Sequence, residues 1–207
     1  MITLYGTSKS RASRCLVALE ELGLTYRHVP LFQHGLVDAD REAVRALNPN
    51  AHIPILDDDG LILWESMAIN LYLADKHGSK LGGASWPSGS RERGLIYQWS
   101  LWSQTEMDRP DWHQALRTGD ADRIALARDQ RLATLSRLDA AVAGRDYLLG
   151  EAFTFADLNV AATICQPNEG GRIDGDFDPF ANGLPALGAW LQRCTTRDAW
   201  LKIRDFP

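Results

Sequence analysis

The segment AHIPILDDDGLILWES, residues 51–66, places a proline where a strand would donate a backbone hydrogen bond. Two apolar runs flank Asp-Asp-Asp-Gly, which predicts a hairpin turn between two strands. Pro54 has no N–H to donate, and a cis Ile53–Pro54 bond costs far less than a cis bond elsewhere. A cis turn would leave the N–H and C=O of Ile53 facing outward, where an extended peptide could pair with them. An edge-strand proline in a plain turn is the alternative.

Glu65 and Ser66 follow the second of these strands directly. Ser66 is a good helix cap, and the N–H groups behind it form a site that suits a carboxylate. Glu65 could hold an ammonium group. Together the two side chains predict a site for the zwitterion of an amino acid, although Ser66 alone could be an ordinary cap.

These residues must be positioned by an α/β domain, which the alternation of patterns over residues 1–78 predicts. The expected elements are a strand at 2–5, a helix at 10–22, a strand at 26–31, a helix at 38–47, the hairpin, and a helix at 66–77 that Gly78 ends. This order indicates a small mixed sheet with helices on its faces. The last helix is apolar nearly all round, so it should be buried on both sides with Asn70 hydrogen-bonded inside.

Residues 79–207 show a different sequence pattern from residues 1–78. Residues 79–90, SKLGGASWPSGS, are rich in Gly, Ser and Pro and predict a linker. Residues 91–207 show helical patterns only, with helices expected at 91–107, 121–143, 154–165, 184–194 and 197–203, and a loop at 168–178. In FTFADL, Thr154 and Asp157 have the spacing of a capping box, and Phe153 and Leu158 that of a hydrophobic staple.

Composition narrows the class of protein. The chain of 207 residues is 45% hydrophobic and 24% charged, and its net charge is -5. A negative net charge does not favour binding to nucleic acid or to an anionic membrane. No signal peptide pattern and no membrane-length apolar run is present. Three cysteines without paired spacing favour a reducing cytoplasm. The five histidines lack metal-ligand spacing, so no metal is expected.

Several long segments resemble cytosolic glutathione transferases of a serine-type, bacterial-like kind. These segments are LYGTSKSRASRCLVALEELGL, NPNAHIPILDDDGLILWESMAINLYLADKHG and FTFADLNVA. The resemblance extends over essentially the whole chain. It implies a thioredoxin-like glutathione-binding domain at 1–78, a linker at 79–90, and a helical domain at 91–207 that forms the electrophile pocket.

The resemblance also implies roles for the ligand-binding residues. Glu65 and Ser66 match the pair that holds the γ-glutamyl group of glutathione. Ile53, before Pro54, matches the residue whose backbone pairs with the cysteine of the ligand. His52 stands where many relatives place a side chain that reaches toward the glycine carboxylate.

A thiol is a poor nucleophile, so a transferase must favour the thiolate, and a hydroxyl donor at a helix N-terminus can do this. Serine-type members carry the donor in the loop after the first strand, here YGTSKSRASR. Its hydroxyl residues are Thr7, Ser8, Ser10 and Ser13. Ser10 is favoured as the natural cap of the first helix, with Arg11 adding positive potential, and Ser8 is the second candidate. Tyr5 is interpreted as a strand residue and Cys15 as a buried core thiol.

The function expected from the resemblance is detoxification, in which the thiolate of glutathione, a co-substrate, is conjugated to a small hydrophobic electrophile. A cytoplasmic homodimer is expected on the same ground. Glutathione-dependent isomerisation or dehalogenation would use the same thiolate. A glutathione-binding protein without catalysis is a further alternative, which the hydroxyl-rich loop disfavours.

Overall fold

The structure, a computed structural model, describes residues 1–31, 38–81, 86–87, 89–108, 115, 118–165 and 177–206. Its first part is built on a four-stranded sheet in the order β2-β1-β3-β4. The strands are β1 (Ile2–Tyr5), β2 (Tyr26–Val29), β3 (Ile55–Asp58) and β4 (Leu61–Trp64). β1 pairs parallel with β2 and antiparallel with β3, and β3 pairs antiparallel with β4. The sheet is therefore mixed, as predicted.

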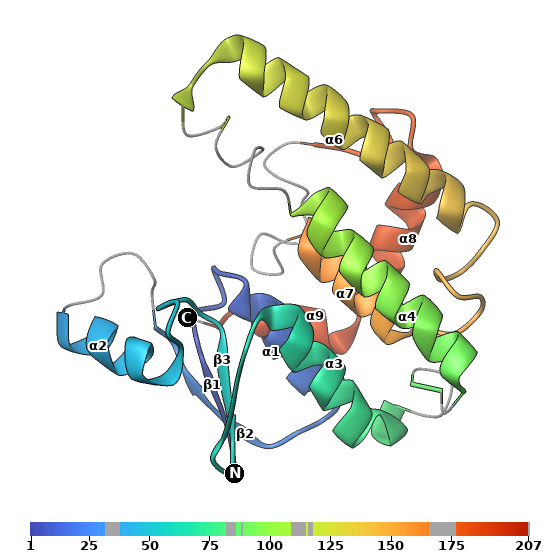
Figure 1. The fold of residues 1–207 in the computed structure, drawn as a ribbon. Coiled ribbons are helices and arrows are strands. Elements are labelled where there is room, and N and C mark those ends of the chain that lie inside the picture. Colours follow the sequence, from blue (N-terminus) through green and yellow to red (C-terminus); the bar gives the residue numbers. More distant parts are fainter. Residues whose placement is uncertain are drawn as a thin grey trace.

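Helices cover both faces of this sheet. α1 (Ala12–Glu21) and α3 (Ser66–His77) lie on one side, and α2 (Asp38–Leu47) lies on the other (Figure 1). This arrangement confirms the thioredoxin-like fold class that the sequence predicts.

The predicted hairpin is present, and Pro54 lies directly before its first strand. Asp59 and Gly60 connect β3 to β4, and their φ values of 52° and 93° are those of a two-residue turn that follows the twist of the strands. The alternative of an edge-strand proline is wrong, because β3 has a neighbour on each side and begins only after Pro54. The Ile53–Pro54 peptide bond is cis.

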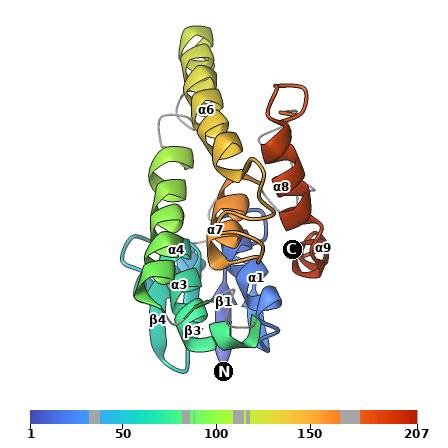
Figure 2. The same cartoon turned by 90° about the vertical axis from the view of Figure 1, so that its right-hand side faces the viewer.

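The second part is helical. α4 (Ser90–Trp102) continues into a π-helical turn, η2 (Ser103–Met107), and is followed by α6 (Ala121–Val142), α7 (Phe155–Ile164), α8 (Pro185–Thr195) and α9 (Asp198–Ile203). The loop expected at 168–178 lies mostly outside the described residues. α7 lies between α4 and α8 (Figure 2) and is buried along nearly its whole length. Fold class is thus confirmed for this half as well.

The capping box fixes the start of α7. Thr154 is the N-cap, and its N–H and Oγ1 both donate to the Asp157 carboxylate at 2.9 Å. Asp157 also accepts bonds from the N–H of Leu148 at 2.8 Å and from Nε1 of Trp190 at 2.9 Å. Burial raises the pKa of Asp157, and these four donors act against that rise. The carboxylate thus ties α7 to α8 and to the chain before it.

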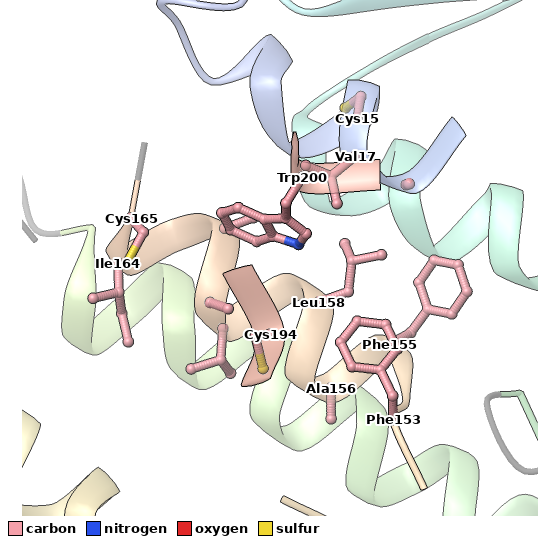
Figure 3. Packing of buried hydrophobic residues seen from close by; sticks show 14 of the residues in the cluster. Cys15, Val17, Phe153, Phe155, Ala156, Leu158, Ile164, Cys165, Cys194 and Trp200 are labelled. Carbon is pink, nitrogen blue, oxygen red and sulfur yellow. The ribbon is translucent and has the colours of Figure 1, made fainter. Parts of the chain in front are cut away.

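One hydrophobic core joins the two halves. Phe155 and Leu158 of α7 lie near Val17 of α1 and Trp200 of α9 (Figure 3), and all four belong to the same buried cluster. Asn70 of α3 is fully buried, as expected, but Ala68 on the same helix is exposed, so α3 is not buried all round.

Gly78 is the C-cap of α3, as predicted, but it does not stop the chain from coiling further. α3 ends at His77, but Gly78 keeps a helical φ of -60° and the chain runs on as a 3₁₀ turn, η1 (Gly78–Leu81). A Cβ on Gly78 would lie 2.5 Å from Cβ of Trp86, so glycine is needed for packing. Trp86, from the segment predicted as a linker, packs edge-on against Tyr97 and Phe155.

Candidate functional site

Gly6 is the point at which the hydroxyl loop meets the cis-proline turn. A Cβ on Gly6 would lie 2.7 Å from Cβ of Ala12 and 3.3 Å from Cβ of Ile53. Its φ of 132° is one that side-chain-bearing residues rarely adopt. The N–H of Gly6 donates to the C=O of Val29 at 2.9 Å, which continues the sheet. Glycine therefore allows β1, α1 and the Ile53–Pro54 turn to converge.

Ser10 lies half-buried two residues before α1. Its Oγ accepts a hydrogen bond from the N–H of Ala12 at 3.1 Å and donates one to the C=O of Thr7 at 2.8 Å. The N-cap position falls on Arg11, one residue later than predicted, but Arg11 has helical dihedral angles and no capping bond, whereas the Ser10 hydroxyl makes the predicted capping bond to Ala12. The Ser10 hydroxyl therefore lies at the N-terminus of α1.

The other hydroxyls of the loop are buried and bonded elsewhere. Ser8 is fully buried and donates to the C=O of Phe206 at 2.7 Å. Ser13 is 2% exposed and donates to the C=O of Ser10 at 2.8 Å. Thr7 is 3% exposed. Of the four candidates, Ser10 alone has a partly exposed side chain.

Arg11 is not a free positive charge, and its partner was missed by sequence reasoning. Asp108, at the end of η2, accepts hydrogen bonds from Nε and Nη2 of Arg11 at 2.8 and 2.9 Å. The same carboxylate accepts one from Nη2 of the buried Arg14 at 3.0 Å. The hydrogen bond to Asp108 raises the pKa of Arg11, and burial lowers that of Arg14. The charge of Glu65 also raises the pKa of Arg11, so the two guanidinium groups lie near two carboxylates.

Glu65 and Ser66 begin α3, but the N-cap lies one residue earlier than predicted. Glu65 is the N-cap, exposed, with a φ of 72°, and Ser66 is the first helical residue. Ser66 is buried, and its Oγ accepts a bond from Nη1 of Arg14 at 3.4 Å. The sulfur of Cys15 lies 3.6 Å from the C=O of Ser66. The start of α3 therefore rests on α1.

The cis-proline turn has its own support. Ile53 and Pro54 are buried, while His52 is exposed. The C=O of His52 accepts a bond from Nδ2 of Asn48 at 2.8 Å, and Oδ1 of Asn48 accepts one from the N–H of Asn50 at 3.0 Å. Among the residues that the structure describes, the backbone of Ile53 takes part in no hydrogen bond of this loop. Asn48 is a further residue that the sequence pattern did not single out.

Cys15 is a core residue, as interpreted from the sequence. It is fully buried, and burial raises the pKa of its thiol far above the ordinary value. Within the described ranges no cluster of His, Cys, Asp or Glu could hold a metal ion. No described helix has the length and apolar character needed to cross a membrane.

The fold is a thioredoxin-like domain joined to a helical domain. The Ser10 loop, the cis Ile53–Pro54 turn and Glu65 follow or precede strand residues that are paired in register, Tyr5, Ile55 and Trp64. Family models give the same result. The model "Glutathione S-transferase, N-terminal domain" matches residues 1–75, and "Glutathione S-transferase, C-terminal domain" matches residues 99–198. The chain belongs to the glutathione S-transferase family.

Individual relatives agree with this assignment. The chain is 30% identical over 224 residues to glutathione S-transferase GstB of Escherichia coli (strain K12), covering 100% of this chain and 99% of that protein. It is 27% identical to rat glutathione S-transferase theta-1, over 80% of this chain and 75% of that one. Among solved structures, a theta class glutathione S-transferase from Xanthomonas axonopodis pv. citri with glutathione bound is 30% identical, with a TM-score of 0.80 over 97% of this chain and 95% of that one.

Proposed function

We propose that the protein is a glutathione transferase that conjugates glutathione to a small hydrophobic electrophile in the cytoplasm, with a detoxifying role. The observation that carries the proposal is the half-exposed Ser10 hydroxyl at the N-terminus of α1, beside the cis Ile53–Pro54 turn. Bound glutathione in the 30% identical Xanthomonas structure supports the choice of thiol.

The ligand would lie along the ends of the strands. The open backbone of Ile53 would pair with the cysteine residue of glutathione as an added strand. Glu65 would bind the γ-glutamyl ammonium group, and the N–H groups and hydroxyl at Ser66 would bind its carboxylate. The exposed His52 would reach the glycine carboxylate.

Ser10 would act as a donor to sulfur. In this structure its proton points to the C=O of Thr7, while its Oγ accepts the N–H of Ala12. On binding, the O–H would turn from Thr7 to the sulfur, and the bond from Ala12 would keep the oxygen in place. The guanidinium groups of Arg11 and Arg14 would also favour the thiolate, although the carboxylates of Asp108 and Glu65 would oppose part of this effect.

The reaction itself needs no covalent step on the protein. The bound thiol releases its proton to solvent, and the thiolate sulfur uses its electron pair to form a bond with the electrophilic carbon. In a substitution the leaving group departs with its bonding electrons. In an addition the substrate takes up a proton instead.

The first test is the pKa of the bound glutathione thiol, followed by thiolate absorbance across pH in the wild type and in Ser10→Ala. The wild type should titrate well below the free thiol value of about 8.5, and Ser10→Ala should raise the pKa toward it. Ser136→Ala is the matched control, because Ser136 is an exposed serine of α6 whose hydroxyl bonds only its own helix. Binding of glutathione with an unshifted thiol pKa would instead indicate a binding protein without catalysis.

We also propose a homodimer. β4 is an outer strand of the sheet and exposes Leu61 and Trp64, and α4 exposes Leu95 and Leu101. These four side chains are between 38% and 58% exposed, and a second copy would cover them.

A further inference from the structure

The segment that follows α9 contacts the loop that carries Ser10. Oγ of Ser8 donates to the C=O of Phe206 at 2.7 Å, across 198 positions of sequence, and Ser8 is fully buried. The imidazole of His28, from β2, stacks on the ring of Phe206 with 5.8 Å between centroids and 27° between planes. In Figure 1 the C-terminal end of the drawn chain lies beside the sheet, near the end of β1.

His28 also contacts the loop that carries Ser10 directly, through a hydrogen bond. Its Nε2 lies 2.7 Å from the C=O of Gly6. A carbonyl only accepts, so Nε2 carries the proton and donates it. Gly6 and Ser8 are therefore held on either side of Thr7, one by His28 and the other by Phe206.

The segment itself is firmly anchored. Arg197, at the start of α9, forms a two-pronged ion pair with Glu21 of α1 at 2.6 and 2.8 Å. Lys202 pairs with Glu20, one residue earlier on α1. Trp200 and Ile203 of α9 are buried in the common core. Phe206 is thus presented to the loop from a fixed helix.

Thr7 links these contacts to Ser10. The C=O of Thr7 accepts the Ser10 hydroxyl at 2.8 Å and the Ser10 N–H at 3.2 Å. A shift of Gly6 or Ser8 would move this carbonyl, and Ser10 would move with it. Displacements of about 1 Å at a site are enough to cost large factors in rate.

We propose that Ser8, His28 and Phe206 form a brace that positions the Ser10 hydroxyl for the sulfur of glutathione. None of the three touches the reacting atoms, so they are positioning residues. The inference rests on the proposed role of Ser10.

Three variants test the brace. Ser8→Ala removes the bond to Phe206. His28→Phe keeps an aromatic ring against Phe206 but removes the bond to Gly6, and His28→Gln keeps an N–H donor but removes the stacking. For each, we would measure the bound thiol pKa together with kcat and KM for glutathione, with chlorodinitrobenzene as the electrophile. Ser136→Ala is again the control.

The expected result is a raised thiol pKa and a kcat lowered about 10-fold in Ser8→Ala and His28→Phe, with KM for glutathione changed less than about twofold. His28→Gln should retain more of the wild-type kcat than His28→Phe. A general loss of folding would instead lower the unfolding temperature and the glutathione affinity together. In that case His28→Gln decides between the brace and a loss of folding, because the brace predicts that this variant, which keeps the donor, retains more of the wild-type kcat than His28→Phe.

The outcomes separate the two proposals. If Ser10→Ala raises the thiol pKa while folded Ser8→Ala and His28→Phe leave it and kcat unchanged, the brace is wrong and the proposed function stands. If Ser10→Ala leaves the pKa unchanged, the proposed role of Ser10 fails and the brace fails with it.

Discussion

Glu65 combines an exposed carboxylate with a backbone conformation that few residues with a side chain adopt. Its φ is 72° and its ψ is 113°, directly before the first turn of α3. Such a conformation costs roughly 1–3 kcal/mol and persists where the surrounding structure imposes it, often at a binding site. Here it sets the side chain at the N-terminus of a helix that rests on Arg14 and Cys15.

Two substitutions at Glu65 separate its backbone from its carboxylate. Glu65→Ala and Glu65→Gly should both weaken glutathione binding, because both remove the group proposed to hold the ammonium. Glu65→Gly should be about 1 kcal/mol more stable than Glu65→Ala, because glycine accepts a positive φ without a Cβ clash. Urea unfolding and titration calorimetry with glutathione measure the two effects. Equal stability of the two variants would contradict the argument for strain.

At the scale of elements, the site depends on three segments that meet at Gly6. The loop follows β1, α1 begins at Ala12, and Ile53 lies in the turn before β3. None of the three presents a complete site alone. Because the three segments approach closely at Gly6, a change in how they pack would also change the geometry of the proposed binding site.

Gly6→Ala and Gly23→Ala form a matched pair. Both glycines have positive φ, 132° and 58°, but a Cβ on Gly23 meets nothing within 4 Å. Gly23→Ala should cost about 1–2 kcal/mol of stability from its backbone alone and leave glutathione affinity unchanged. Gly6→Ala should cost more, because its Cβ would lie 2.7 Å from that of Ala12, and should also weaken glutathione binding. If the two variants had similar stability and affinity, small movements of the structure would relieve the contact between the Cβ of residue 6 and that of Ala12 without cost.

At the scale of the whole molecule, buried polar groups join the two halves across the core. Nδ2 of Asn70 in α3 donates to the C=O of Arg14 at 3.2 Å and to Oδ1 of Asn159 in α7 at 2.9 Å. Nδ2 of Asn159 donates to Oγ of Ser100 in α4 at 2.8 Å. This chain of bonds fixes α1, α3, α7 and α4 relative to one another.

Asn70→Ala should therefore lower the free energy of unfolding by about 2 kcal/mol, because it leaves buried acceptors on Arg14 and Asn159 without this donor. The matched control is Asn182→Ala. The Asn182 side chain is exposed and donates only to the C=O of Asp178, so its loss should cost less than about 0.5 kcal/mol. Urea unfolding at neutral pH measures both. Equal small losses would mean that solvent or rearrangement satisfies the buried acceptors.

The proposed dimer is tested by light scattering on the wild type, Leu101→Asp and Leu126→Asp. Leu101 of α4 and Leu126 of α6 are similarly exposed, at 58% and 60%. Leu101→Asp should halve the mass, because it places a charge in the proposed interface, and Leu126→Asp should not. A monomeric wild type, or the same response to both substitutions, would contradict the proposed interface.

Much of the fold could be predicted from the sequence because the relevant signals are local. The period of α2, the Asp59–Gly60 turn, and the capping box at Thr154 and Asp157 each depend on residues within a few positions of one another. Ile53–Pro54 and Glu65-Ser66 could be proposed as a binding segment for the same reason. The start of α3 at Ser66 was predicted correctly, but its N-cap is Glu65 rather than Ser66, and α1 begins at Ala12 rather than at Ser10, because these positions depend on backbone angles that neighbouring elements impose.

Only the tertiary structure decided how the hydroxyls of residues 7–13 are used. Three of them lie in the loop before α1 and Ser13 lies in its first turn, and the sequence favoured Ser10 without excluding Ser8. The hydroxyl of Ser8 bonds to Phe206, and Arg11 bonds to Asp108, partners that lie 198 and 97 positions away. The local pattern determined the elements and predicted an amino-acid or peptide ligand, whereas glutathione was implied by the resemblance to a family. The choice among chemically equivalent side chains depends on long-range packing, which local pattern does not specify.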